Sequence, residues 1–179
     1  MSTSDPHHHS AWRIRAWDDT RLAERFLELG LVAVSEDDIG QDVTRFASEK
    51  ALRRKILEEN PGRSDQAIGT FVTYWRDFSR TMKTGDTIVL AYRDRRGTLR
   101  AAIGSVSGEY QYCADEPDLR LRHRRAVRWH ITVNRNELDD DLRRAVNTPA
   151  TINRFRATDA YSRLAAMASD SGEPHRVSS

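Results

Sequence analysis

Arginines give this sequence its clearest chemical signal, because they gather in two short stretches. The first stretch surrounds a turn at 94–97, and the second occupies 120–128 together with His123. The members are Arg93, Arg95, Arg96 and Arg100 in the first, and Arg120, Arg122, Arg124, Arg125 and Arg128 in the second. A guanidinium can hold a phosphate through two parallel hydrogen bonds. If adjacent strands bring the two groups together they predict an anionic partner, whereas each arginine alone is an ordinary solvated surface residue.

A second candidate site lies at 12–17, where side chains alternate between two faces of a predicted strand. One face is apolar, and the other carries Arg13, Arg15 and Trp17. Two arginines beside an indole at a strand end are typical of a site where a base stacks. The alternative is an arginine packed against a surface tryptophan.

Composition restricts the class of protein. The chain has 179 residues, of which 38% are hydrophobic and 31% charged, with a net charge of +2. So small a charge excludes histone-like binding. No apolar run approaches the ~20 residues that cross a bilayer, no signal-peptide pattern opens the chain, and Cys113 is the single cysteine. We expect a cytoplasmic protein with one domain at 11–168, between disordered tails at 1–10 and 169–179.

Motifs of common enzymes and cofactor-binding proteins are absent. The sequence has no P-loop, dinucleotide fingerprint, Cys-x-x-Cys, His-Glu-x-x-His or Gly-x-Ser-x-Gly. His123 and His130 would point to opposite faces of a regular strand, and the histidines at 7–9 lie in a predicted tail. We therefore expect no metal and no cofactor, and binding rather than catalysis.

The elements that position these residues are organised around a predicted hairpin. Asp86 to Arg93 and Leu99 to Val106 are its strands, and Gly104 and Gly108 predict a bulge or a close approach in the second strand. Other strands are expected at 31–34 and 126–133. Helices are expected at 21–29, 48–59, 64–82, 136–146 and 158–168. The helix at 64–82 carries an aromatic stripe, from which Tyr74 and Trp75 can reach the rim of a cavity.

Several short motifs in a fixed order resemble a known family. They are Trp12-x-x-Arg15-Ala16, Leu31-Val32-Ala33-Val34, Asp42-Val43-Thr44, Trp75-x-x-Phe78, Met82-x-x-Gly85-Asp86, Ile103-Gly104-x-Val106-x-Gly108-x-Tyr110-x-Tyr112 and His123-Arg124-x-x-x-Arg128-Trp129. This series, from Trp12 to Phe155, is similar to the PUA-like modules of EVE/YTH type found at the N-terminal side of Mrr-type and other modification-dependent restriction proteins.

The resemblance implies an α+β fold with a small curved mixed sheet or open barrel flanked by helices. It also implies that the module binds nucleic acid and accepts one modified base, flipped out of the stack, in an aromatic pocket. The sequence departs from the family pattern at two positions. Trp17 stands where a glycine follows the first strand, and Ser35 stands where a tryptophan is common after the second. These departures affect which base is recognised.

From the residues and the resemblance together we predict a base pocket and a backbone-contacting surface. The pocket residues are Trp17, Asp42, Trp75, Tyr74, Ser35 and Arg15. In this pocket the two indoles stack on the base, Asp42 accepts an exocyclic amine, and Arg15 closes the pocket or holds a phosphate. The phosphate contacts are Arg95, Arg96, Arg122, Arg124 and Arg125.

The expected ligand is DNA carrying a modified, methylated base, with DNA preferred over RNA. Any cutting would come from a partner nuclease or motor, in a restriction or defence system. Three alternatives stay open: an RNA-binding module of the same fold, a protein-interaction module, and an enzyme acting on a modified nucleoside. For the enzyme, Asp42 is the one good catalytic carboxylate.

Overall fold

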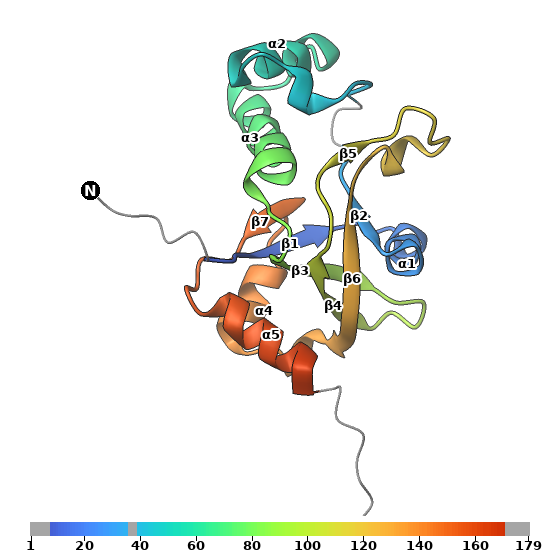
Figure 1. Ribbon diagram of the computed structural model, residues 1–179, viewed down its shortest axis with the longest axis vertical. Coiled ribbons are helices and arrows are strands. Elements are labelled where there is room, and N and C mark those ends of the chain that lie inside the picture. The colour runs from blue at the N-terminus through green and yellow to red at the C-terminus, as the bar shows by residue number, and fades with distance from the viewer. Residues whose placement is uncertain (1–7, 36–38, 171–179) are drawn as a thin grey trace, which may run out of the picture.

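A mixed β-sheet forms the centre of the molecule in a computed structural model that describes residues 8–35 and 39–170 (Figure 1). The strand order is β2-β6-β4-β3-β1-β7, with β5 also paired to β6. The strands are β1 Ala11–Arg15, β2 Leu31–Ala33, β3 Thr87–Arg93, β4 Leu99–Val106, β5 Gln111–Tyr112, β6 His123–Asn134 and β7 Ile152–Arg154. Strands β1 and β3 are parallel, and the other neighbours are antiparallel.

Helices flank this sheet, which confirms the predicted α+β class with a curved mixed sheet. The α-helices are α1 Thr20–Leu29, α2 Glu49–Glu59, α3 Asp65–Arg76, α4 Asp140–Val146 and α5 Ala160–Asp170. Short 3-10 helices lie at η2 Val43–Arg45, η4 Leu119–Leu121 and η5 Arg135–Glu137, and a π-helix, η3, at Asp77–Thr81. Figure 1 shows α4 and α5 below the sheet and α2 and α3 above it.

Two apolar cores lie on the two faces of the sheet. Along β3, Ile88 and Leu90 join the core that α1, α2 and α3 cover, whereas Val89 and Ala91 join the core under α4 and α5. Successive side chains of a strand point to opposite faces, so a strand covered on both faces is apolar throughout. This explains the unbroken apolar run at 88–91.

The predicted hairpin is confirmed as β3 and β4, paired from Thr87↔Ser105 to Arg93↔Leu99. The bulge predicted at Gly104 is also confirmed, because the β4–β6 register shifts between Ile103 and Gly104. A Cβ at Gly104 would lie 2.8 Å from the Arg128 carbonyl oxygen, so only glycine lets β6 approach this closely.

The helix predicted at 64–82 differs from the observed one. Helix α3 ends at Arg76, and the chain continues as the wider turns of η3. The buried guanidinium of Arg125 donates to the carbonyl oxygens of Phe78 and Met82 at 2.7 and 2.8 Å. Carbonyl oxygens at a helix end lack partners within the helix, and Arg125 supplies hydrogen-bond donors to those at the end of η3.

Other boundaries also differ from the predictions. Strand β6 extends beyond the predicted 126–133, and the helix predicted at 136–146 is divided into η5 and α4. Residues 1–7 and 171–179 of the predicted tails, and the acidic stretch 36–38, lie outside the described part of the chain, whereas residues 169–170 of the predicted C-terminal tail belong to α5. Ser10, however, donates its N–H to Asp86 at 2.9 Å, so it packs at the sheet. No helix of the described part of the chain has the length and apolar character needed to cross a membrane.

Candidate functional site

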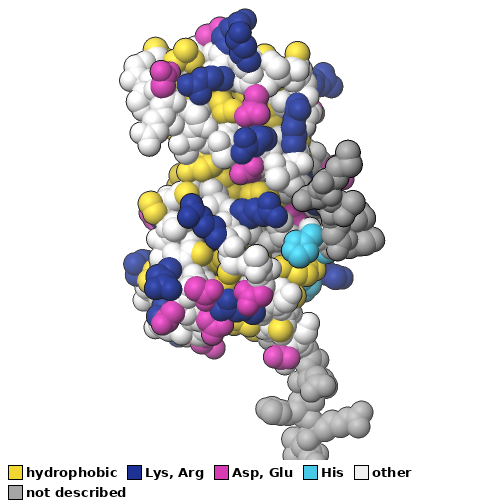
Figure 2. Space-filling view, turned by 90° about the vertical axis from the view of Figure 1, so that its left-hand side faces the viewer, with side chains coloured by type: hydrophobic (Ala, Val, Ile, Leu, Met, Phe, Trp, Pro, Cys, Tyr) yellow, Lys and Arg dark blue, Asp and Glu magenta, His cyan; other side chains and the backbone are white. Residues whose placement is uncertain are grey.

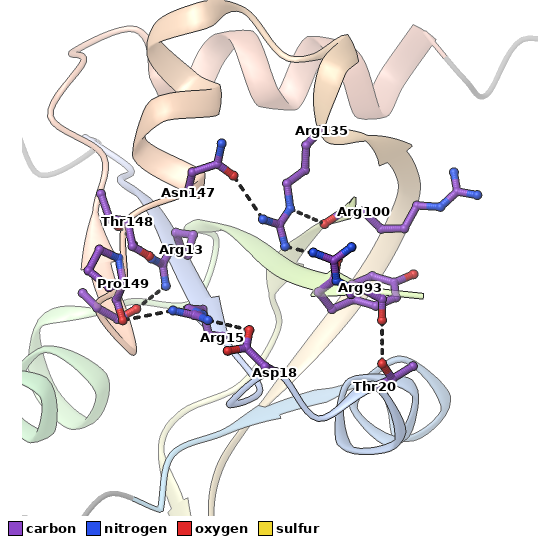
Figure 3. A network of polar contacts seen from close by, with 12 residues as sticks. Arg13, Arg15, Asp18, Thr20, Arg93, Arg100, Arg135, Asn147, Thr148 and Pro149 are labelled. Carbon is purple, nitrogen blue, oxygen red and sulfur yellow. Dashed lines mark hydrogen bonds and ion pairs between the residues drawn. The ribbon is translucent and has the colours of Figure 1, made fainter. Parts of the chain in front are cut away.

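Four arginines from separate segments converge at one end of the sheet (Figure 3). Arg13 and Arg15 come from β1, Arg93 ends β3, and Arg135 follows β6. Parallel β1 and β3 end at the same edge, and antiparallel pairing of β4 with β6 returns the chain to that edge. We call these four residues the arginine face.

Arg13 is the most deeply placed member of the arginine face, with 0% of its area exposed. Its guanidinium donates to the carbonyl oxygens of Thr148 and Ala150, and at 2.7 Å to Thr148 Oγ1. Its Nε has no hydrogen-bond partner among the described residues. Burial, followed by the positive charges of Arg15 and Arg135, lowers the pKa of Arg13 to about 10. Arg13 therefore stays cationic at neutral pH.

Arg135 is held by neutral acceptors alone among the described residues. It donates to the carbonyl oxygens of Arg100 and Tyr92 at 3.1 and 3.2 Å, and to Asn147 Oδ1 at 3.0 Å. Burial lowers the pKa of Arg135, followed by the charges of Arg15 and Arg93. The negative charge of Asp18 opposes this repulsion only in part, since the pKa of Arg135 is still lowered overall.

Asp18 is the acidic residue that pairs with the arginine face in the described part of the chain. Arg15 donates to Asp18 Oδ1 at 2.5 Å and to the Pro149 carbonyl oxygen at 3.2 Å. The Asp18 side chain is 83% exposed, so its charge is well screened by water. Positive charge therefore dominates this end of the sheet.

Trp17 stands at the surface next to these arginines in sequence. Both Trp17 and Asp18 adopt positive φ angles, 46° and 56°, and 36% of Trp17 is exposed. Such angles are uncommon in residues with a Cβ. The turn they form ends at Asp19, whose carboxylate caps α1 by accepting from the Leu22 N–H at 3.1 Å.

Trp75 lies in the core and not at a surface. It is 0% exposed, and its ring packs edge-on against His123 with centroids 4.6 Å apart. Its Nε1 has no partner among the residues that the structure describes. Tyr74, one position earlier on α3, is half-buried and lies 6.4 Å from the ring of Phe71.

Asp42 and Ser35 are linked to His123, the histidine that Trp75 contacts, through their neighbours in sequence. Asp42 Oδ1 accepts from the backbone N–H and the hydroxyl of Thr44 at 2.9 and 2.6 Å, which caps η2. The next N–H, of Val43, donates to the Tyr110 hydroxyl, which lies 2.7 Å from His123 Nδ1. Ser35 follows Val34, whose N–H donates to the His123 carbonyl oxygen at 3.0 Å.

The six predicted pocket residues thus do not form one site: Tyr74 packs against Phe71 on α3, and the other five fall into two groups. Arg15 and Trp17 belong to the end of β1. Trp75 packs on His123 at the start of β6, while Ser35 and Asp42 are each next in sequence to a residue that bonds His123 or its partner Tyr110. Both ring nitrogens of His123 have partners: Nδ1 contacts the Tyr110 hydroxyl, and Nε2 contacts the Ile39 carbonyl oxygen. Because a carbonyl oxygen only accepts hydrogen bonds, Nε2 carries the proton. In this second group only Trp75 is buried, and its Nε1 lacks a partner among the described residues, whereas Ser35 and Asp42 are partly exposed.

The five predicted phosphate contacts are also divided. The register pairs Arg100 with Asn134 and Val106 with Val127, so the two arginine stretches lie toward opposite ends of β4. Adjacent strands do not bring them together as the sequence suggested. On the hairpin, Arg95 pairs with Glu24 at 2.7 Å and Arg96 is exposed.

The second arginine stretch is held largely by protein groups. Arg122 donates to the Glu116 carbonyl oxygen at 2.8 Å, and Arg124 pairs with the Glu116 carboxylate at 3.3 Å. Arg125 is buried under η3 with its donors on backbone carbonyls, and in this position it is not available to a phosphate. On the face drawn in Figure 2, basic and acidic side chains are likewise interspersed.

Sequence reasoning did not identify Arg93 and Arg135 as partners of Arg15. The alternation at 12–17 showed that Arg13 and Arg15 share a face, but it carried no information on which strands lie beside β1. The pairing of β1 with β3 brings Arg93 to this end, and the length of β6 brings Arg135 there.

The chain is similar to solved structures and to one protein family. No curated protein matches it significantly. The YTH domain of the Zygosaccharomyces rouxii MRB1 protein, solved in complex with N6-methyladenosine RNA, aligns with a TM-score of 0.46 and 14% identity, over 92% of this chain and 90% of that one. The YTH domain of Pho92, solved in complex with m6A, aligns with a TM-score of 0.45 and 10% identity, over 92% and 87%.

The family comparison is more decisive, because its match covers most of the chain. A family model described as a domain of unknown function, DUF8426, matches residues 12–156. These residues contain every strand of the sheet except the first residue of β1, and the whole arginine face. The protein therefore belongs to the DUF8426 family.

Proposed function

We propose that the protein is a nucleic-acid-binding module that uses the arginine face together with Trp17. The observation that carries this proposal is the set of four converging guanidiniums, Arg13, Arg15, Arg93 and Arg135, with one exposed carboxylate beside them. Uncompensated positive charge attracts a polyanion and orients it on the surface.

The arrangement also reduces the cost of binding. Arg13 and Arg135 are already fixed by carbonyl and amide oxygens, so binding a phosphate does not have to order them. A bound phosphate would relieve the repulsion that lowers the pKa of both residues. The buried Arg13 contributes mainly charge, while the half-buried Arg15 and exposed Arg93 offer donors at the surface.

Trp17 supplies the stacking surface for a base in this proposal. An exposed indole, two residues after Arg15 in sequence, offers a surface on which an unpaired or flipped base stacks, because every base has a π face. The small net charge of +2 fits a short single-stranded segment better than a long wrapped duplex.

The predicted preference for DNA and the predicted role in restriction depend on the sequence resemblance alone. The arginine face offers contacts to phosphates, which DNA and RNA share, and the 2′-hydroxyl is what separates them. RNA carrying N6-methyladenosine is the ligand of one solved complex described above, so it is the first ligand to test.

The test is a fluorescence-anisotropy titration of four labelled single strands of one sequence: RNA and DNA, each with adenine or N6-methyladenine at the centre. If Trp17 stacks on a base, Trp17→Ala weakens binding of the preferred strand by about 1–3 kcal/mol. Leu29→Ala, which removes the exposed apolar side chain at the last residue of α1, is the matched control and leaves affinity unchanged.

Comparison of the methylated and unmethylated strands tests base recognition separately. A wild-type preference that disappears in Trp17→Ala supports a modified-base reader, and equal affinity for both strands limits the protein to general nucleic-acid binding. Absence of binding to all four strands at moderate salt would refute the proposed function.

A further inference from the structure

A cleft of about 630 Å³ opens between the first turn of α1 and the turn of the β3–β4 hairpin. Its lining residues are Thr20, Arg21, Arg93, Asp94, Arg95 and Gly97. The two walls are tied together, because Thr20 Oγ1 donates to the Arg93 carbonyl oxygen at 2.7 Å (Figure 3). We infer that this cleft is a seat for a phosphate group next to the base that stacks on Trp17, an inference that rests on the proposed function.

Two arginines of the cleft have guanidinium N–H groups without a hydrogen-bond partner in the described part of the chain. Arg93 uses Nη1 for the Gly97 carbonyl oxygen at 2.6 Å, and its Nε and Nη2 have no partner among the described residues. The Arg21 guanidinium likewise has no hydrogen bond or ion pair within the described part of the chain. Because Arg21 lies on the helix wall and Arg93 on the hairpin wall, an anion between them is reached from two sides.

The carboxylates near the cleft are already neutralised. Asp94 Oδ1 accepts from the backbone N–H groups of Arg96 and Thr98 at 2.9 Å each, and Asp94 Oδ2 accepts from Arg100 Nε at 2.9 Å. These bonds lower the pKa of Asp94, with the Arg100 contact as the main cause. Asp94 therefore opposes an incoming anion less than a free carboxylate would.

The carboxylate of Glu24 is likewise neutralised by an arginine. It accepts two parallel bonds from Arg95, at 2.8 and 2.7 Å, and the Arg95 side chain lowers its pKa. This bidentate pair fixes one side of the cleft without using Arg21 or Arg93.

The arginine face and the N-terminus of α1 add positive potential to the cleft. Arg93 belongs both to the arginine face and to the cleft lining, so the arginine face lies directly beside the cleft. The N-terminus of α1 also favours negative charge, although Asp19 already accepts the Leu22 N–H. The ligand contacts are therefore guanidinium groups, and the helix contributes its dipole only.

A phosphate satisfies these donors better than a carboxylate does. It presents oxygens in several directions, so Arg21 and Arg93 can each make their own contacts from opposite walls. Trp17 lies three residues before Thr20, on the turn that leads into the cleft wall. A strand stacked on Trp17 therefore has its backbone close to the cleft.

The test uses Arg21→Gln, Arg93→Gln and the double variant, with Arg25→Gln as the control on α1. Affinity for the single strand that wild type binds best is measured by anisotropy at several salt concentrations. We expect each cleft variant to weaken binding several-fold without changing base preference, and to reduce the slope of log affinity against log salt by about 1. Arg25→Gln should match wild type.

A second measurement uses inorganic phosphate alone. Phosphate titrated into the full-length protein should shift the amide NMR signals of Thr20 and Gly97, and these shifts should be lost in the double variant. Thermal unfolding should be unchanged, because Arg21 and Arg93 are both exposed.

The outcomes separate this seat from the proposed function. Wild-type affinity and salt slope in Arg21→Gln, while Arg93→Gln and Trp17→Ala weaken binding, would overturn the seat alone, because Arg93 also belongs to the arginine face. If no nucleic acid binds but phosphate shifts Thr20 and Gly97, the proposed function fails and the cleft is a site for free phosphate. Phosphate shifts confined to residues elsewhere would overturn the seat in every case.

Discussion

The indole of Trp12 donates from Nε1 to Asp86 Oδ2 over 2.8 Å, and both side chains are buried. This bond joins the start of β1 to the residue before β3, next to the parallel pair Trp12↔Ile88. The same register places Arg15 beside Ala91, two residues before Arg93. The Trp12–Asp86 bond therefore stabilises the alignment on which the arginine face depends.

Asp86→Ala should destabilise the protein strongly. Besides Trp12, the carboxylate accepts the backbone N–H groups of Ser10 and Lys83 at 2.9 and 3.0 Å. Each buried donor left without a partner costs about 1–3 kcal/mol. Urea unfolding measures the loss, and Asp115→Ala, at an exposed position, is the control. Equal unfolding midpoints for the two variants would contradict this role of Asp86.

Arg125→Met should reduce stability and leave nucleic-acid affinity intact. Arg125 donates hydrogen bonds to the carbonyl oxygens of Phe78, Met82 and Gly108, and the methionine thioether can donate none of them. We expect a loss of at least about 2 kcal/mol in the free energy of unfolding. Arg124→Met, which removes one half-exposed ion pair, should have a much smaller effect. A stable Arg125→Met variant with weakened binding would restore the phosphate role predicted from the sequence.

Gly104→Ala should destabilise the sheet at its bulge. An added Cβ would lie 2.8 Å from the Arg128 carbonyl oxygen, from Trp129 Cε3 and from Val127 Cγ1. Relieving such overpacking typically costs about 1–3 kcal/mol. Gly40→Ala is the control, since its Cβ would meet no atom within 4 Å. Thermal melts of both variants give the comparison, and matching melting temperatures would show that β6 can move aside.

The Arg163 network should make stability depend on acid pH. Arg163 on α5 bonds both oxygens of Asp141, at 2.7 and 2.8 Å, and holds the pKa of Asp141 well below its ordinary value near 3.8. A depressed carboxyl pKa contributes stability above the unfolded pKa, and the contribution is lost as pH falls through the folded pKa.

Arg163→Gln should therefore be less stable than wild type at pH 6, and the difference should shrink as the pH falls below about 3.8. Urea unfolding from pH 6 to pH 2.5 measures this, with the exposed Arg54→Gln as control. A constant difference across this range would show that Arg163 stabilises through packing and not through the charge of Asp141.

Local patterns predicted the elements well where one segment contains the whole signal. The N-cap at Asp19 and the glycine at Gly30 bound α1 within one residue of the prediction. The turn residues between β3 and β4 predicted the hairpin, and a glycine inside the second strand predicted the bulge at Gly104. The end of α3 was missed because it depends on Arg125, which is 43 residues from its partner Met82.

The candidate site was less predictable, for the same reason. Trp75 belongs to an apolar helical stripe, which suits both a core and a pocket rim, and only its packing on His123 decides for the core. The arginine stretches at 93–100 and 120–128 are prominent in sequence, yet strand register separates them.

The sequence by itself determined the hairpin and the alternation that puts Arg13 and Arg15 on one face, because both follow from side-chain periodicity and turn chemistry within a short segment. Its resemblance to a known family implied the α+β class. Only the tertiary structure decided that these two residues meet Arg93 and Arg135. Strand order and register are set by long-range pairing and burial, and no local pattern encodes which distant strand will lie alongside β1.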